Sequence, residues 1–147
     1  MRQIRFRAKR VDNGRWLHGV SLINFAPDDK ESQYFIPDRG KSCDALADAD
    51  GEINRLDGMK VYRVQSKTIC QFTGAEDANH REIYEGDIVN HAGKLYEIRY
   101  LRNYARFAGV KPGVRFAVFS FRSCTIVGNI FDHPRMLDEF YAKERGE

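Results

Sequence analysis

The first part of the chain alternates apolar and polar residues with a period of two. In residues 4–9, Ile, Phe and Ala alternate with Arg and Lys, which predicts a half-buried strand with a basic outer face. Asn13-Gly14 follows, and this dipeptide between two such runs is a strong hairpin signal because both residues tolerate positive φ. We therefore expect a hairpin whose return strand covers residues 16–25.

The middle of the chain is less regular. Residues 33–36 predict a short third strand that Pro37 stops, because proline cannot donate to a strand ladder. The acidic, glycine-containing segment 38–58 has weak periodicity and predicts a long loop. Strand character then resumes in two runs, residues 61–64 and 68–72, and a polar loop over residues 73–80 follows.

From residue 83 onward the apolar pattern becomes denser. Five short runs at near-regular spacing predict a small barrel or sandwich, and Pro112-Gly113 fits a turn between two of them. The runs lie at residues 88–89, 95–100, 104–110, 114–121 and 125–131. Apolar residues at helical spacing between residues 133 and 145 predict one C-terminal helix that packs against the sheet.

The length and composition describe a folded chain. It has 147 residues, of which 42% are hydrophobic and 31% charged, a globular balance and not that of a disordered chain. This length accommodates one domain or two small ones that share a core. The prediction is an all-β, β-dominated protein: an N-terminal β segment over residues 1–72 with the acidic loop 38–58, then a small β-barrel with a short C-terminal helix over residues 73–147.

Two features of the sequence predict a cytoplasmic protein. The first residues alternate charge with apolar side chains and lack the apolar core of a secretory signal, and no apolar run approaches the ~18 residues that cross a bilayer. The three cysteines, Cys43, Cys70 and Cys124, are far apart and odd in number, which fits neither a disulfide framework nor a zinc site. We expect free thiols in a reducing compartment and no membrane partner.

The positive charge is unevenly distributed. The formal net charge is only +3, yet residues 99–122 hold six basic residues and no acidic one. Aromatic residues are interleaved with them, and small barrels bind single-stranded nucleic acid by pairing Arg or Lys with stacking aromatics. The candidate nucleic-acid-binding residues are Arg99, Arg102, Tyr104, Arg106, Arg115 and Arg122.

A structural interpretation of the same stretch stands beside this one. Barrel strands need apolar inner faces, so Phe107, Phe116 and Phe119 are also expected in the core, with the arginines on a solvated outer face. The favoured functional interpretation is a non-enzymatic protein-interaction or self-assembly module, in which strand edges or an apolar patch pair with another copy or with another protein. A homo-oligomer is the expected partner state under this interpretation. Nucleic-acid binding is the alternative.

The sequence offers no pattern for catalysis or metal binding. It has no phosphate loop, nucleophile elbow or dinucleotide fingerprint, so we expect no enzyme, no cofactor and no small-molecule substrate. Residues 48–53 partly match a calcium-binding loop, but the ligand positions at both ends do not fit. The four histidines have no metal spacing, so no metal site is expected. Glu85 and Asp87 beside Gly86 predict turn capping, not an acid-base pair.

Three blocks of the sequence resemble the YopX family of bacteriophage and prophage proteins. They cover nearly the whole chain in the family's order: Met1 to Trp16 with its Asp12-Asn13-Gly14-Arg15-Trp16 end, Gln71-Phe72-Thr73-Gly74 with Asn79 through Val89, and Ile126-Val127-Gly128-Asn129-Ile130-Phe131 followed by Pro134. The segment 75–78 stands where the family usually has a Leu-containing turn, and His80 replaces a Gly.

The resemblance implies a fold and a setting but no activity. It implies a mostly antiparallel protein whose later part is similar to an SH3-like barrel, encoded by phage-derived genes and acting in a bacterial host cell. In that setting the partner protein of an interaction module would be a host or phage protein. A fold alone does not define a function, so the resemblance assigns no activity to the residues of this chain.

Overall fold

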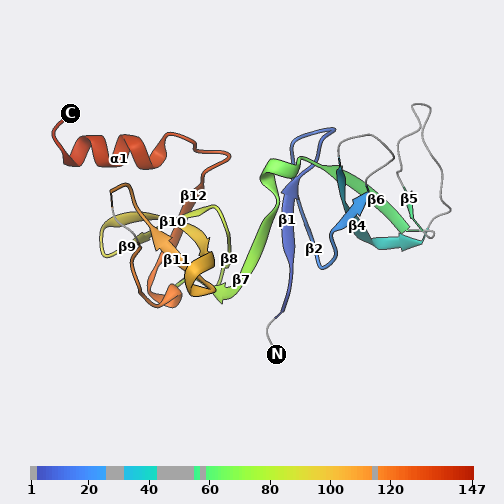
Figure 1. Cartoon of the computed structure of the whole chain (residues 1–147), viewed down its shortest axis with the longest axis horizontal. Coiled ribbons are helices and arrows are strands. Elements are labelled where there is room, and N and C mark those ends of the chain that lie inside the picture. The colour runs from blue at the N-terminus through green and yellow to red at the C-terminus, as the bar shows by residue number, and fades with distance from the viewer. Residues whose placement is uncertain (1–2, 26–31, 43–54, 57–58, 114–115) are drawn as a thin grey trace. The chain divides into compact units, whose positions relative to one another are not determined.

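The computed structural model describes residues 3–25, 32–42, 55–56, 59–113 and 116–147 (Figure 1). Strands dominate the described part, which confirms the prediction of a β-dominated fold. Two compact units make up the chain: the N-terminal unit, residues 4–71, and the C-terminal unit, residues 72–147 with Gln3. The predicted division at residues 72 and 73 stays a prediction about independently folding domains, and each unit is described by itself.

The N-terminal unit opens with the predicted hairpin. Strand β1 (Phe6–Lys9) pairs antiparallel with β2 (Trp16–Gly19), and Gly14 in the turn has a φ of +68°. The first residues of β7 (Cys70–Glu76) pair with the other side of β1. Arg7, placed by the pattern on a solvated face, is instead buried against the Trp16 ring, 4.5 Å from its centroid.

A second sheet completes this unit. Its strand order is β3-β4-β6-β5, and all of its pairs are antiparallel. The strands are β3 (Ile23–Phe25), β4 (Gln33–Ser42), β5 (Arg55–Leu56) and β6 (Met59–Val64), followed by the short 3-10 helix η1 (Ser66–Thr68). Ala8, Ile36 and Val64 form the buried centre of the unit.

Two strand boundaries differ from the prediction. The expected return strand divides into β2 and β3, which belong to different sheets. At Gly19, the last residue of β2, a Cβ atom would lie 2.5 Å from the Ile36 Cγ2 atom. Strand β4 also continues past Pro37, which pairs with Val61. The ladder becomes irregular directly after this proline, and strands tolerate proline at such irregularities.

Part of the segment predicted as an acidic loop forms strands instead. Residues 38–42 belong to β4 and residues 55–56 form β5. Residues 43–54 and 57–58, with the calcium-loop-like segment and Cys43, lie outside the described residues.

The C-terminal unit contains a curled half-barrel sheet with the strand order β11-β10-β9-β12. Its strands are β9 (Asp87–His91), β10 (Lys94–Leu101), β11 (Arg106–Val110) and β12 (Thr125–Asn129), and β8 (Glu82–Tyr84) pairs with β7 beside them. The buried centre comprises Ile83, Val89, Tyr96, Ile98 and Cys124. Half-buried phenylalanines pack against this centre.

One expected strand is missing from the described part of this unit. Of the run predicted over residues 114–121, the described residues 116–120 make a single bridge, Ala117 to Gly109. Two 3-10 helices carry candidate residues: η2 (Arg102–Tyr104), which precedes β11, and η3 (Phe121–Ser123), which precedes β12. Val114 and Arg115 are outside the described residues.

The predicted C-terminal helix is present as α1 (Met136–Glu144) (Figure 1). Tyr141 is its buried residue, and the Tyr141 hydroxyl donates a hydrogen bond of 2.5 Å to the Leu95 carbonyl in β10. An ion pair between Lys94 and Glu144 joins the same two elements. Within the described part of the chain, no helix is long and apolar enough to cross a membrane.

Candidate functional site

A pocket of about 360 Å³ in the C-terminal unit brings basic and aromatic residues together. We call it the Phe–Arg pocket, and its lining residues are Ala75, Arg106, Phe107, Phe119, Ser120, Phe121 and Arg122. They come from β7, β11, η3 and the segment before η3. The pocket therefore joins residues up to 47 positions apart in the sequence.

The turn before β11 sets the position of Arg106, the first residue of that strand. Ala105 ends η2 with a φ of +49°, the left-handed region, and the chain reverses there into β11. Phe107 then pairs across the ladder with Tyr100, and their rings meet edge to face with centroids 5.2 Å apart. Two neighbouring residues of β11 thus supply a cation and a ring to the same pocket.

Phe119 is held by aromatic neighbours. Its ring stacks on His91 with centroids 4.3 Å apart and planes 9° from parallel, and it lies 5.2 Å from Tyr96 and 5.9 Å from Phe121. Gly109 makes room for this ring, because a Cβ atom there would lie 2.7 Å from two Phe119 ring atoms. The position of Phe119 is thus set before any ligand arrives.

Hydrogen bonds from side chains hold the turn that presents Phe121 and Arg122. The Ser123 hydroxyl donates to the Ser120 carbonyl at 2.6 Å, and the Cys124 thiol donates to the Phe121 carbonyl at 3.0 Å. Burial raises the pKa of the Cys124 thiol to about 11, so it remains a protonated donor at neutral pH. The Ser123 oxygen also lies 3.2 Å from the His91 Nδ1 atom, which ties the turn to β9.

The charge of the pocket has one sign. Arg106 and Arg122 are both exposed, and no acidic residue is among the described residues that line it. A concave surface with apolar walls and two cations attracts anions and accepts flat apolar groups. The lining of the pocket thus combines exposed cations with aromatic walls.

The other predicted site residues lie apart from this pocket. The Arg99 guanidinium binds the buried Glu97 carboxylate at 2.7 and 2.6 Å, and this hydrogen bond raises the pKa of Arg99. Arg102 and Tyr104 are exposed on η2, where the Tyr104 ring lies 4.9 Å from that of Phe116. Arg115 lies outside the described residues. The pocket thus unites Arg106 and Arg122 from the predicted set and leaves Arg99, Arg102 and Tyr104 outside its lining.

Sequence reasoning missed part of this pocket. Three lining residues were not predicted as site residues: Ala75, Ser120 and Phe121. The only signal for Phe121 was its place directly before Arg122, in the run Ser120-Phe121-Arg122-Ser123. Phe107 and Phe119 were expected in the core, and they both pack against it and line the pocket. The core and site interpretations of these two rings are therefore both partly right.

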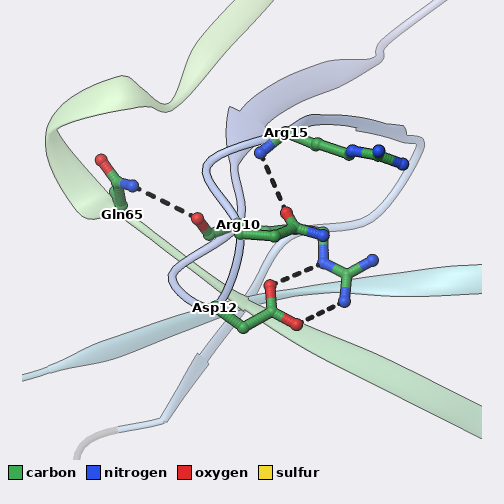
Figure 2. Close-up of polar contacts among 5 residues, drawn as sticks. Arg10, Asp12, Arg15 and Gln65 are labelled. Carbon is green, nitrogen blue, oxygen red and sulfur yellow. Dashed lines mark hydrogen bonds and ion pairs between the residues drawn. The ribbon is translucent and has the colours of Figure 1, made fainter.

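A polar cluster in the N-terminal unit has a structural explanation. The Arg10 side chain donates two hydrogen bonds to the Asp12 carboxylate, at 2.9 and 2.5 Å (Figure 2). Its guanidinium lies 3.9 Å from the Tyr62 ring centroid, and the Gln65 amide donates to the Arg10 carbonyl at 3.2 Å. The hydrogen bond from Arg10 lowers the pKa of Asp12. This cluster links the β1–β2 turn to β6 and to Gln65, the residue before η1.

The residues of the middle motif are also structural. The buried Asp77 carboxylate accepts backbone hydrogen bonds of 2.9 Å from Asn79, Arg81 and Ile126. Burial alone would raise the pKa of Asp77. The hydrogen bonds from the three backbone donors, with that from Ile126 the largest, have the stronger effect, so the pKa of Asp77 is lowered. The Asp87 carboxylate accepts from the Tyr84 N–H at 2.8 Å, which confirms its predicted capping of the Gly86 turn.

No metal centre is found in the ranges that the structure describes, where no three His, Cys, Asp or Glu side chains are grouped for one. The fold defines the class of this protein: a strand-dominated chain with a curled half-barrel sheet, one described α-helix at its C-terminal end and a basic, aromatic pocket. The family model described as YopX protein matches residues 5–138, and the chain belongs to the YopX family.

One solved structure is similar over most of both chains. Protein EF1440 from Enterococcus faecalis is 21% identical to this chain, and the match covers 91% of this chain and 97% of that one with a TM-score of 0.48. The comparison with curated proteins gave no match.

Proposed function

We propose that this chain is a non-enzymatic, phage-type accessory protein that binds nucleic acid through the Phe–Arg pocket. The observation that supports this is the lining of the pocket, which has three phenylalanine rings and two exposed arginines. Guanidinium groups neutralise phosphates and stack on flat groups, and aromatic rings stack on bases. YopX family membership supports the phage-type setting.

Binding of this kind has a measurable dependence on salt. Each arginine that neutralises a phosphate releases counterions, so the affinity falls as salt rises, with a slope of about 0.7 to 0.9 per contact. Replacement of both Arg106 and Arg122 by glutamine should therefore weaken binding and flatten the slope by about 1.4 to 1.8.

The experiment measures fluorescence anisotropy of labelled oligonucleotides, single-stranded and duplex, at low and at physiological salt. The Arg106→Glu/Arg122→Glu variant should lose binding to both forms. A matched Arg135→Glu/Arg145→Glu variant changes the charge equally at exposed sites outside the pocket, and it should keep most of the affinity. The proposal fails if neither nucleic acid binds at low salt, or if both double variants behave alike.

Self-association is a second candidate function, and exposed apolar side chains favour it. Val118 is 65% exposed and Tyr104 55%, both in the C-terminal unit. Strand edges are less suited, since the Ile126 N–H is taken by Asp77 and the Gly109 carbonyl accepts from the Ala117 N–H. A side-chain patch around Val118 is the surface that a second copy would cover.

Sedimentation velocity at micromolar concentration tests this second candidate. A discrete oligomer that Val118→Lys converts to monomer would support it, because a buried lysine destabilises an apolar contact. A wild-type monomer would exclude it at that concentration.

The proposed place of action is the cytoplasm of a bacterial host. Cys70 and Cys124 are buried thiols and not halves of a disulfide, as expected in a reducing compartment. Fractionation of a host cell that expresses the chain tests this, and recovery in the periplasm would contradict it.

A further inference from the structure

We propose that the Phe–Arg pocket takes one unpaired base, so that the protein selects single strands over duplex. This inference rests on the proposed nucleic-acid function and specifies which form of nucleic acid the pocket takes. It comes from the volume of the pocket, the arrangement of its rings and the placement of its two arginines.

The volume of the pocket suits one flat group and its immediate neighbours. At about 360 Å³, the pocket lies near the lower end of the range for small-ligand sites. A base within a duplex is stacked on both sides and cannot present its face to a wall unless it leaves the helix, which costs unpairing and unstacking energy. An unpaired base carries no pairing cost, so a pocket of this kind favours single strands.

The rings of the pocket are not packed face to face with one another. Phe119 and Phe121 meet at 64°, and Phe107 has its edge-to-face contact with Tyr100, at 65°. All three rings are only half-buried, so part of each ring surface reaches the pocket or the solvent. Phe119 already stacks on His91, so Phe121 is the ring that we assign to the base.

The two arginines suit the strand on either side of that base. Arg106 begins β11 and Arg122 lies in η3, so they come from separate elements that line one pocket, and both are exposed. A strand that inserts one base has a phosphate before it and a phosphate after it, and each can meet one guanidinium. Duplex DNA would be held by these contacts alone.

The test compares single-stranded and duplex oligonucleotides of the same sequence by anisotropy, for the wild type and for Phe121→Leu. Leucine keeps an apolar side chain but removes the stacking face, and single-strand affinity should fall about 5- to 150-fold while duplex affinity stays unchanged. Phe140→Leu is the matched control, since Phe140 is a half-buried ring of α1 in the same unit that lies outside this pocket. It should change neither affinity.

A second variant fills the pocket without touching a ring. Ala75 lines the pocket from β7, and Ala75→Leu should lower single-strand affinity to the duplex level. This variant decides the matter if Phe121→Leu does not fold.

The outcomes separate the two proposals. Equal affinity for single strand and duplex, or unchanged single-strand affinity in both pocket variants, overturns the unpaired-base inference and leaves nucleic-acid binding in place. Absence of binding to either form at low salt overturns both. Selective loss of single-strand affinity in the pocket variants supports the inference.

Discussion

Ala92 and Gly93 form a two-residue turn in which both residues have positive φ, +51° and +78°. The flanking residues His91 and Lys94 are paired across β9 and β10, so the loop is a type I′ hairpin turn. This turn favours Asn-Gly, because asparagine tolerates the left-handed region better than alanine does. The alanine is therefore a strained residue in an otherwise regular hairpin.

Replacement of this alanine should stabilise the protein. Ala92→Asn is expected to raise the free energy of unfolding by about 0.5–1 kcal/mol, because it relieves a left-handed alanine. Urea unfolding followed by circular dichroism measures the difference. Ala78→Asn is the control, since Ala78 is exposed in a turn and lacks a positive φ, and it should give no gain. An equal gain in both variants would contradict the explanation.

Gly109 is required for a different reason, because its φ is not positive and the constraint is space. A Cβ atom there would lie 2.7 Å from the Phe119 ring and 3.0 Å from the Tyr96 Cβ. Gly109→Ala should lower the free energy of unfolding by about 1–3 kcal/mol through overpacking, and should also weaken nucleic-acid binding by displacing Phe119. Thermal unfolding and the anisotropy assay measure the two effects. An unchanged melting temperature would show that the Phe119 ring moves aside at no cost, which would contradict its packing against His91 and Tyr96.

At this scale the family motif could be recognised from the sequence, but the site could not. His80 stands where the family usually has glycine, and its φ is +60°, which explains the usual glycine. A Cβ atom at Gly128 would lie 2.7 Å from the His133 Nδ1 atom, and the Asn129 side chain accepts backbone hydrogen bonds from Phe131 and Asp132. The motif residues thus maintain turns, and the pocket is built elsewhere.

At the scale of elements, Asp77 joins the loop after β7 to strand β12. Its three backbone hydrogen bonds reach residues on both elements, and the Ala78 N–H adds one to the Cys124 carbonyl. These bonds cover part of the outer edge of β12. A single buried carboxylate therefore links this loop to β12.

Removal of this carboxylate should be costly. Asp77→Ala should lower the free energy of unfolding by roughly 2–4 kcal/mol, because it leaves backbone donors without an acceptor. Asp77→Asn keeps one acceptor oxygen and should lose less. Denaturant unfolding of both variants measures the two losses in the free energy of unfolding. Equal losses would show that the hydrogen bonds to the carboxylate contribute little.

The same carboxylate predicts a dependence on pH. The pKa of Asp77 is lower in the folded chain, so its charge stabilises the fold above the unfolded value of about 3.9. That contribution is lost as the pH falls through the still lower folded pKa. As the pH falls from about 5 to below this unfolded value, the free energy of unfolding of the wild type should therefore decrease more than that of Asp77→Asn. Denaturant unfolding at each pH measures the difference. Parallel pH curves for the two proteins would contradict this.

Most elements followed from periodicity, and the exceptions have physical causes. The hairpin at Asn13-Gly14 and the helix around Tyr141 depend on local signals, and both were predicted. Proline at position 37 was taken to end a strand, yet a strand also tolerates it at an irregularity. In residues 116–121 the side chains that pack against the centre, Ala117, Phe119 and Phe121, recur with the period of a strand, but they come from a segment that is not a strand. Period alone does not distinguish these cases.

At the scale of the whole molecule, each unit has a buried centre of its own. Residues 72–147 contain the half-barrel sheet, α1 and the Phe–Arg pocket. We expect this fragment, expressed alone, to unfold cooperatively and to bind single-stranded oligonucleotide as the full chain does, because the contacts that build the pocket lie within it. Calorimetry and anisotropy test this prediction. A fragment without a cooperative transition would show that the N-terminal unit is needed for folding.

The grouping of the arginines could not be predicted at this scale. Arg99 and Arg106 are closer in the sequence than Arg106 and Arg122, yet only the second pair lines one pocket. Arg99 is instead paired with Glu97, two residues away on the same strand, and η3 supplies Arg122 to the pocket. Charge counted along a sequence records neither such ion pairs nor the loops that bring distant residues together.

Strand β7 has a consequence for how this chain can change in length. Its residues Cys70 and Gln71 pair with β1, and its residues from Phe72 pair with β8. Successive residues of a strand face opposite sides, so one residue inserted among the β7 residues that pair with β8 would exchange the faces of the β7 residues that follow it within the C-terminal unit. Over evolution, insertions and deletions should therefore collect in the turns of YopX proteins and avoid this strand.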